Sequence, residues 1–296
     1  DWTDPNVNDT DICQNIRTHD VLHDIPIIIH TADNSPQMRA RIITAGATDI
    51  FPKPVTDIEL KSRVHLHLEF RIMVKGLQDY HKRLTRDLEI ARSMQYALLP
   101  EEKLLQEIAE KHHIDIAHKY ETSDELGGDF WGVDILDEDR IFIYVTDFAG
   151  HGVSAAMNTF RLHSLVTHYD DVVSPADYLE KLNRILFKLL PVEQYATMLC
   201  GIIDVKKDNF TYAAAASTAP LLSVMGSRDV TLLDPSGFPL GMIADATYET
   251  REIPFSKGEM LFLYSDVLTE SKDQLGRMIG EEKFIRMCED TCQNIS

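Results

Sequence analysis

Two aspartates lie in glycine-rich turns and a third ends an apolar run, an arrangement that suits a metal ion bound to phosphate. Asp129 closes a Leu-Gly-Gly-Asp turn, and Asp147 follows eighteen positions later (147 minus 129), after the apolar run 141–145. Asp266 ends a similar run, residues 261–265. Hard divalent cations take oxygen ligands, and glycine lets backbone and phosphate approach closely. The pattern predicts a metal-dependent site that handles phosphate.

A second set of residues, early in the chain, has the makings of a phosphoryl-acceptor site. Asp1 is an acid, Thr31 follows an apolar run that begins at Pro26, and Lys53 lies in a Phe-Pro-Lys-Pro segment. A carboxylate can attack a phosphoryl group while a metal ion and a lysine neutralise charge and a hydroxyl contacts the product. An ordinary terminal acid is the alternative for Asp1, and the joint spacing disfavours it.

Composition limits the class of protein. The 296 residues suit two domains, and 44% apolar content is normal for a globular protein. The formal net charge of −19, from 48 acidic and 29 basic residues, argues against binding nucleic acid or anionic membranes. We see no membrane-spanning run and no signal peptide. The four cysteines form no CxxC pair. Reduced thiols in a cytoplasmic protein are the expectation.

The first segment, residues 1–68, alternates helix-like and strand-like pieces. Helices are expected over residues 10–18, 38–45 and 57–68, and strands over residues 26–30 and 49–51. This rhythm is typical of an α/β fold, in which helices cover both faces of a parallel sheet.

The second segment, residues 69–99, is predicted to be a helical linker. Apolar residues that begin at Leu66 and end at Ala91 recur in steps of three and four, with one stutter near Leu84. Such a heptad seam favours one long helix over about residues 66–98 and a parallel two-stranded coiled coil, which would make a homodimer. A single helix packed on a neighbouring domain is the alternative.

The third segment, residues 100–296, is predicted to be an α+β sandwich with helices flanking mostly antiparallel sheets. Strands are expected over residues 114–118, 130–135, 141–146, 197–205, 209–215, 221–225, 230–233 and 260–265. Helices are expected over residues 153–169 and 175–190.

The first segment resembles the receiver domain of two-component response regulators, which has a flavodoxin-like fold. The resemblance implies that Asp1 accepts a phosphoryl group from an upstream histidine kinase and that Thr31 and Lys53 contact it. It also implies that Asp1 and the backbone carbonyl of Thr3 hold a Mg²⁺ ion. The strands and helix that precede the acceptor in such domains have no counterpart, so the N-terminal part is expected to be missing. Ile50 stands where receivers usually carry a switch aromatic residue.

From about residue 87 to about residue 284, the chain resembles the SpoIIE/RsbU branch of the PPM protein phosphatases. Five motifs carry the resemblance in order: residues 87–100, 126–129, 147–152, 238–241 and 264–266. It implies two Mn²⁺ or Mg²⁺ ions held by the catalytic aspartates Asp129, Asp147 and Asp266, with the Phe148 carbonyl as a further ligand. It also implies a phosphoserine or phosphothreonine protein substrate, commonly an anti-sigma-factor antagonist. His151 either assists a proton transfer or is a solvated loop residue.

Three departures from that family leave a second hypothesis open. Val267 replaces the usual glycine, residues 213–220 differ from the family's Asn-Ala-Gly-His pattern, and the sequence ends at Ser296, before the region that usually brings a final acidic ligand. A receiver-controlled phosphatase is the first hypothesis, and a degenerate phosphatase fold that acts as an adaptor is the second. The three retained aspartates favour the enzyme. A DNA-binding regulator is disfavoured by the charge and by the lack of a basic helix-turn-helix.

Overall fold

The computed structural model describes residues 9–122, 126–150, 152–166, 174–191, 193–273 and 275–294. The chain divides into two compact units, Asp1–Asp87 and Leu88–Ser296, and each is described by itself. Among the described residues, no helix combines the length and apolar character needed to cross a membrane.

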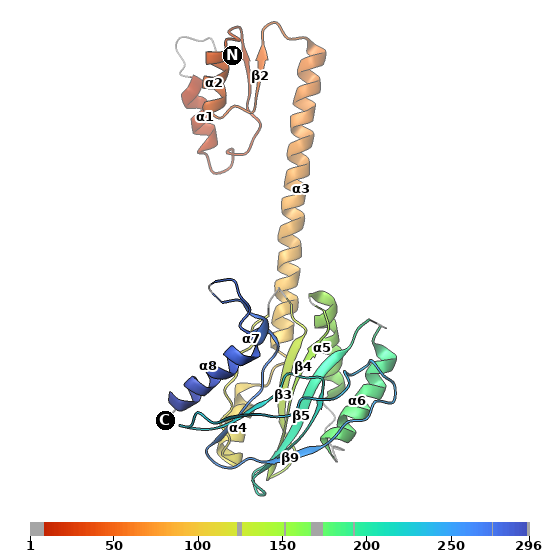
Figure 1. The fold of residues 1–296 in the computed structure, drawn as a ribbon. Coiled ribbons are helices and arrows are strands. Elements are labelled where there is room, and N and C mark those ends of the chain that lie inside the picture. Colours follow the sequence, from red (N-terminus) through yellow and green to blue (C-terminus); the bar gives the residue numbers. More distant parts are fainter. Residues whose placement is uncertain are drawn as a thin grey trace. The chain divides into compact units, whose positions relative to one another are not determined.

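The first unit contains a small parallel α/β arrangement (Figure 1). Its elements are α1 (Asp9–Arg17), β1 (Ile28–Thr31), α2 (Pro36–Thr44), β2 (Asp49–Pro52) and the first part of α3 (Asp57–Tyr96). β1 and β2 pair in parallel, from Ile28 opposite Asp49 to Thr31 opposite Pro52. The buried side chains of this unit include Cys13, Ile27, Ile42, Ala45 and Ile50. The parallel strand–helix rhythm predicted from the sequence is confirmed.

Helix α3 is a single element of 40 residues. The sequence predicted one helix over residues 57–68 and another over about 66–98. The structure continues through their junction because no proline interrupts the segment and Gly76 is its only glycine. Its seam residues are exposed in the chain, with Leu77 68% and Leu84 44% accessible.

Antiparallel strands build two sheets in the second unit. The larger sheet has the order β3-β4-β5-β6-β9, with β3 (Asp129–Ile135), β4 (Arg140–Phe148), β5 (Ala196–Asp204), β6 (Asn209–Ala215) and β9 (Arg251–Pro254). The smaller sheet has the order β10-β7-β8, with β7 (Leu221–Val224), β8 (Val230–Leu232) and β10 (Glu259–Phe262). β3 is an edge strand of the larger sheet.

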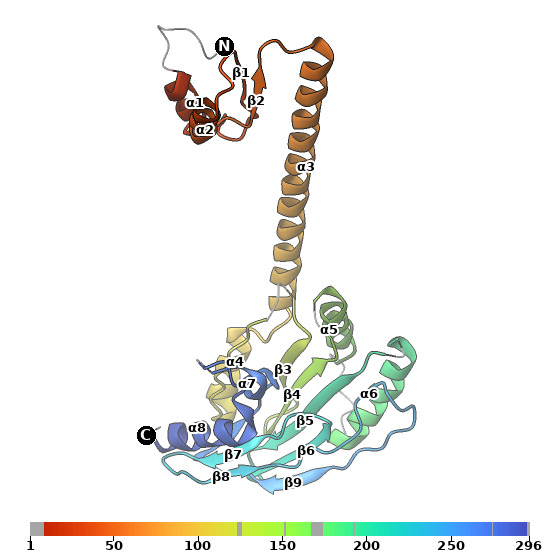
Figure 2. The same cartoon turned by 45° about the horizontal axis from the view of Figure 1, so that its top comes forward.

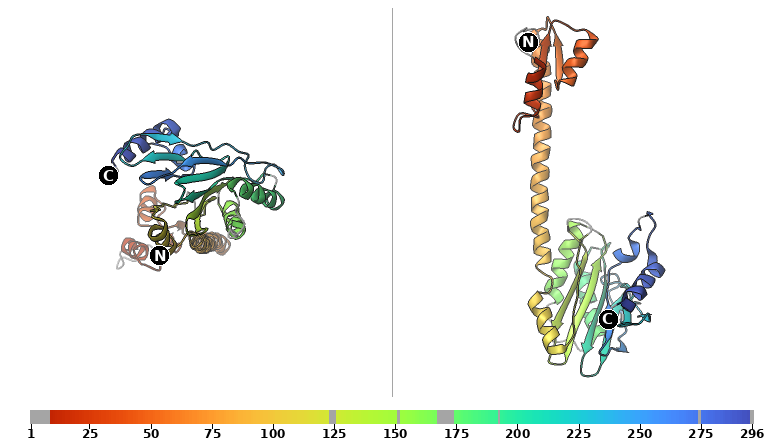
Figure 3. Two further views of the ribbon diagram at one scale, coloured as in Figure 1. Left: turned by 90° about the horizontal axis from the view of Figure 1, so that it is seen from below. Right: turned by 90° about the vertical axis from the view of Figure 1, so that its left-hand side faces the viewer.

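Helices cover these sheets and leave a core between them. The helices of this unit, after the end of α3, are α4 (Glu102–His112), α5 (Val153–Val166), α6 (Pro175–Leu189), α7 (Val267–Glu270) and α8 (Gly280–Asn294). α5 and α6 pack on one face of the larger sheet. The other face contributes to a core shared with β7, β10 and α4. α8 packs on the smaller sheet through Phe284. Figures 2 and 3 show these layers of the α+β sandwich.

Some predicted elements were wrong or missing. Residues 114–118 form no strand, although Ile114 and Ile116 pack against the core between the sheets. Alternating apolar residues can cover a core without joining a hydrogen-bonded ladder, so the period alone does not decide strand pairing. β10 ends at Phe262, three residues before the predicted end. The sequence reading also missed α4, β9, α7 and α8.

Candidate active site

Asp129 and Asp147 face each other across the hairpin of β3 and β4. The strand register pairs the two residues directly, and the Phe148 N–H donates to the Gly128 carbonyl (3.2 Å) beside them. That flanking bond makes 129–147 a non-hydrogen-bonded pair, in which Cα atoms lie about 4.5 Å apart and side chains approach most closely. Strand pairing therefore brings together two carboxylates that are well separated in sequence.

Strand alternation directs both carboxylates into the space between the sheets. On β3, Phe130 packs with the α5 and α6 side, whereas Trp131 packs in the core between the sheets, as does Ile141 of β4. Side chains two residues apart lie on the same face of a strand. Asp129 and Asp147 therefore share the inter-sheet face with Trp131 and Ile141.

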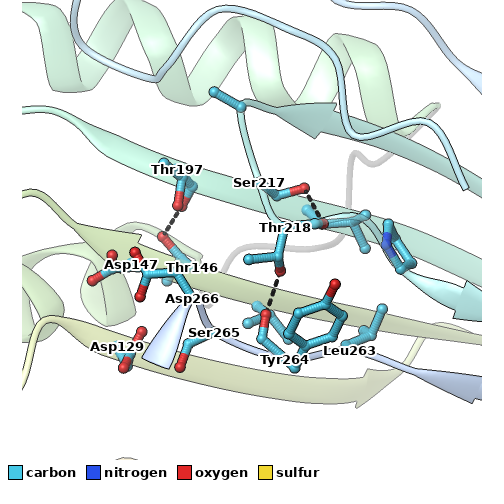
Figure 4. A pocket seen from close by; sticks show the side chains of 14 residues that line it. Asp129, Thr146, Asp147, Thr197, Ser217, Thr218, Leu263, Tyr264, Ser265 and Asp266 are labelled. Carbon is cyan, nitrogen blue, oxygen red and sulfur yellow. Dashed lines mark hydrogen bonds between the residues drawn. The ribbon is translucent and has the colours of Figure 1, made fainter. Parts of the chain in front are cut away.

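Asp266 reaches the same pocket from the smaller sheet. It follows the segment after β10 and immediately precedes α7. The pocket has a volume of about 150 Å³, and all three aspartates line it, together with the hydroxyl residues Thr146 and Ser265. Figure 4 shows the three carboxylates on the same side of this pocket. Two sheets thus contribute acids to one site.

Burial and nearby negative charge oppose ionisation of Asp129 and Asp147. Burial raises the pKa of Asp129 to about 6, and the charge of Asp266 adds to this effect, while a hydrogen bond with Ser265 acts in the opposite direction. Burial likewise raises the pKa of Asp147 to about 7, with further contributions from Asp129, Asp266 and Glu270. A bound cation would favour the charged forms and offset the repulsion.

The oxygen atoms of the site fit hard divalent cations. Oδ1 of Asp129 is buried and has no hydrogen-bond partner in the part of the chain that the structure describes. A Cβ at Gly128 would lie 2.7 Å from the Phe148 carbonyl oxygen and 3.1 Å from Asp147 Oδ1, so both oxygens border the space that this glycine leaves open. Within the described ranges, no group of three or more acidic, histidine or cysteine side chains is arranged to hold one ion. In two-ion sites, the ligands are distributed over ions about 3.5–4 Å apart.

The departures Val267 and Thr218 leave the three acids in the pocket. Val267 begins α7, where the backbone is helical and needs no glycine, and its side chain is exposed. Ala216 follows β6 with a φ of 52°. The Thr218 hydroxyl donates to the Tyr264 carbonyl, which ties this turn to the segment that carries Asp266 (Figure 4).

The receiver residues are only partly described. Thr31 and Lys53 lie at the same edge of the parallel strand pair, where the Lys53 N–H donates to the Thr31 carbonyl (2.8 Å). Thr31 is fully buried, and its hydroxyl accepts from the Asp33 N–H (3.2 Å). Asp1 and Thr3 lie outside the described residues. His151, the candidate proton-transfer residue of the second unit, also lies outside them.

Gln95 is a residue of the site region that the sequence reading missed. It is fully buried, its Nε2 donates to the Gly127 carbonyl (2.8 Å) and to Thr159 Oγ1 (2.9 Å), and its Oε1 accepts from the Gly127 N–H (3.3 Å). The end of α3 is thus fixed to the Gly-Gly-Asp turn. One feature of the sequence could have indicated its burial. Gln95 lies four residues after Ala91, at the next position of the apolar seam.

Family comparisons agree with this fold. A family model described as Stage II sporulation protein E (SpoIIE) matches residues 137–295, and a response regulator receiver domain model matches residues 1–65. The chain is therefore a receiver domain joined to a PP2C-like α+β phosphatase domain. It belongs to the SpoIIE family.

Two curated relatives each match about two thirds of this chain. Phosphoserine phosphatase RsbP of Bacillus subtilis (strain 168) is 29% identical over 194 residues, which cover 64% of this chain and 46% of RsbP. Phosphoserine phosphatase RsbU of the same organism is 24% identical over 204 residues, which cover 69% of this chain and 58% of RsbU. The chain spans about half the length of these relatives.

A solved structure shares the fold. The SiaA-PP2C domain of Pseudomonas aeruginosa superposes with a TM-score of 0.63 at 24% identity, covering 73% of this chain and 85% of that chain. At this identity the likeness concerns the fold, and the chemistry of the site is argued from its own residues.

Proposed function

We propose that the chain is a metal-dependent serine/threonine protein phosphatase under the control of its receiver domain. The observation that carries the proposal is the meeting of Asp129, Asp147 and Asp266 in one pocket between two sheets. Family membership and the phosphoserine phosphatases RsbP and RsbU among its relatives support the same activity.

The proposed chemistry divides between bound cations and the protein. Two Mn²⁺ or Mg²⁺ ions would supply an activated water and neutralise the phosphoryl oxygens. Asp129, Asp147 and Asp266, with the Phe148 carbonyl, would hold the ions. A protein nucleophile is not required.

Phosphate release from a phosphoserine protein tests this proposal. With MnCl₂ present, wild type should release phosphate, and Asp129→Ala and Asp147→Ala should lose activity by about a hundredfold or more, since removing a stabilising group in a catalytic site costs at least that much. Glu138→Ala, an exposed acid in the turn between β3 and β4, is a matched control. Equal turnover by wild type and both aspartate variants would rule out the proposed site.

The adaptor hypothesis makes a different prediction about metal. It was motivated by Val267 and by the altered turn near Thr218, but neither change removes a carboxylate from the pocket. Calorimetric titration with MnCl₂ separates the two hypotheses, because the phosphatase must bind the ion. A folded protein that binds no Mn²⁺ would favour the adaptor.

Regulation by the receiver follows from the two matched domains. We propose that an upstream histidine kinase phosphorylates Asp1, with Mg²⁺ held by Asp1 and the Thr3 carbonyl, and that Thr31 and Lys53 contact the phosphoryl group. Treatment with a small acyl phosphate and Mg²⁺ should change the phosphatase rate of wild type and leave that of Asp1→Asn unchanged. An equal response of both proteins would exclude Asp1 as the acceptor.

We propose the class of substrate from the family to which the chain belongs. An anti-sigma-factor antagonist phosphorylated on serine or threonine is the expected class, and α3 would pair two copies of the chain through its exposed seam. A panel that compares such a phosphoprotein with an unrelated phosphoserine protein tests the substrate class. A kcat/KM no higher for the antagonist would contradict it.

A further inference from the structure

The main-chain carbonyl of Asp129 is held from outside the sheet. β3 is an edge strand, and the pairing of Asp129 with Asp147 is of the non-hydrogen-bonded kind, so the Asp129 carbonyl points away from β4. The Tyr120 hydroxyl donates to this carbonyl (3.1 Å). A group that no strand partner could satisfy therefore has a side-chain partner, as buried backbone oxygens require.

Tyr120 is itself fixed by the last turn of α3. The Tyr96 hydroxyl donates to the Tyr120 carbonyl (3.3 Å), and the two rings meet edge to face with centroids 5.1 Å apart. Arg92 donates to the Tyr96 hydroxyl (3.4 Å) and places its guanidinium 5.4 Å from the centre of that ring. Burial raises the pKa of the Tyr120 hydroxyl, so it remains a donor at neutral pH. Arg92 and Tyr96 of α3 are thus linked through Tyr120 to the backbone of Asp129.

We propose that Tyr120 is a positioning residue for the metal-binding carboxylate of Asp129. The Asp129 carbonyl and Cβ share one Cα, so fixing the carbonyl also limits where the carboxylate can point. Gln95 holds the preceding turn at Gly127, but it makes no hydrogen bond to Asp129 among those described. Tyr120 adds a constraint on Asp129 itself, and Tyr96 keeps Tyr120 in place. This role rests on the proposed phosphatase function, because it requires that Asp129 bind a cation.

The chain offers a matched pair of hydroxyl deletions. Tyr120→Phe removes the donor to Asp129 and keeps the ring that contacts Tyr96. Tyr248→Phe removes a buried hydroxyl that has no hydrogen-bond partner among the described residues and belongs to a side chain on the α5 and α6 side of the sheet. Both variants lose one oxygen from a largely buried tyrosine, so a general effect of deleting a hydroxyl should appear in both.

Calorimetric titration of the metal-free chain with MnCl₂ tests the role without an activity measurement. Tyr120→Phe should weaken the Mn²⁺ dissociation constant threefold to tenfold, which matches the loss of one hydrogen bond of about 0.5–1.5 kcal/mol. Tyr96→Phe should shift it in the same direction by less, and Tyr248→Phe should leave it within twofold of wild type. In phosphatase assays, Tyr120→Phe should need more Mn²⁺ for half-maximal activity and recover most of its kcat at saturating metal.

The outcomes separate this inference from the phosphatase proposal. If wild type binds Mn²⁺ and hydrolyses phosphoserine but Tyr120→Phe has an unchanged dissociation constant, Tyr120 does not position Asp129 and the phosphatase proposal stands. An equal loss of affinity in Tyr248→Phe would also overturn the role, because the effect would then be general. If wild type itself binds no Mn²⁺, the phosphatase proposal fails and this inference fails with it.

Discussion

Ionisation of Asp147 should oppose folding while no cation is bound. Its pKa rises from an ordinary value of 3.8 to about 7 in the fold. Between these values the folded chain binds more protons than the unfolded chain, so this residue makes stability fall as pH rises from about 4 to about 7. Asp147→Asn removes that dependence. With a chelator present, the melting temperature of Asp147→Asn should therefore rise relative to that of wild type as the pH increases across this range. Above about pH 7 the difference should stay constant.

Melting curves at several pH values between 4.5 and 8 test this expectation. Glu138→Gln is the control, because it removes an exposed acid far along the hairpin from the site. Addition of MnCl₂ should raise the melting temperature of wild type and have less effect on Asp147→Asn. A difference between wild type and Asp147→Asn that stays constant with pH would contradict the expectation.

Sequence reasoning named three candidate acids that line one pocket in the structure, but it did not predict the residues that contact their backbone. Asp129 and Asp147 could be predicted because each lies in a glycine-rich turn next to an apolar run, and Asp266 because it ends a similar run. Gln95 and Tyr120 act through backbone groups of residues 32 and 9 positions away. Such partners are set by tertiary packing, and neither residue type is unusual in its own segment.

The junction between α3 and the Gly-Gly-Asp turn should be sensitive to Gln95. Gln95→Met keeps a similar size but leaves the Gly127 N–H and carbonyl buried without this partner. Unsatisfied buried groups cost about 1–3 kcal/mol each, so the variant should melt several degrees lower and bind Mn²⁺ more weakly. Gln78→Met, exposed on the same helix, is the control. Identical melting and Mn²⁺ affinity in both variants would show that this junction does not support the site.

The β3–β4 hairpin should tolerate no side chain at position 128. An alanine Cβ there would lie 2.7 Å from the Phe148 carbonyl oxygen, so the strand ends must separate beside Asp147. Gly128→Ala should lower stability and abolish Mn²⁺ binding. Gly76→Ala is the opposite case, since nothing lies within 4 Å of a Cβ at this position in α3. It should gain about 1 kcal/mol of helix stability. Thermal melting and calorimetry of both variants check the contrast.

At the scale of elements, strands built on an apolar run were predictable, the short β7 and β8 included, whereas β9 and the helices α4 and α8 were not predicted. The runs that became β3, β4, β5 and β6 are each at least 7 residues long and rich in apolar residues. β9 has 4 residues and includes a charged pair, Arg251 and Glu252, so it gives no clear period. The stretch 114–118 had the period of a strand but no partner strand, which only the assembled sheet could decide.

At the scale of the whole chain, two phosphate-handling domains share one continuous helix. The receiver match covers residues 1–65 and the SpoIIE match covers residues 137–295, and α3 begins in the first. Its seam residues are exposed as far as Leu84, whereas Gln95, on the same seam, is buried in the second unit. One face of α3 thus changes from an exposed apolar stripe to a contact with the Gly-Gly-Asp turn.

The exposed stripe makes a prediction about the oligomeric state. Leu77 and Leu84 are 68% and 44% accessible, and a parallel coiled coil would bury both against a second copy. The double variant Leu77→Asp, Leu84→Asp places charges in that seam and should convert a dimer into a monomer in multi-angle light scattering. Lys82→Asp with Arg86→Asp adds acids to the opposite side of α3 and should remain dimeric. A wild type that is monomeric at micromolar concentration, or a seam variant that still dimerises, would show that the stripe does not pair two chains.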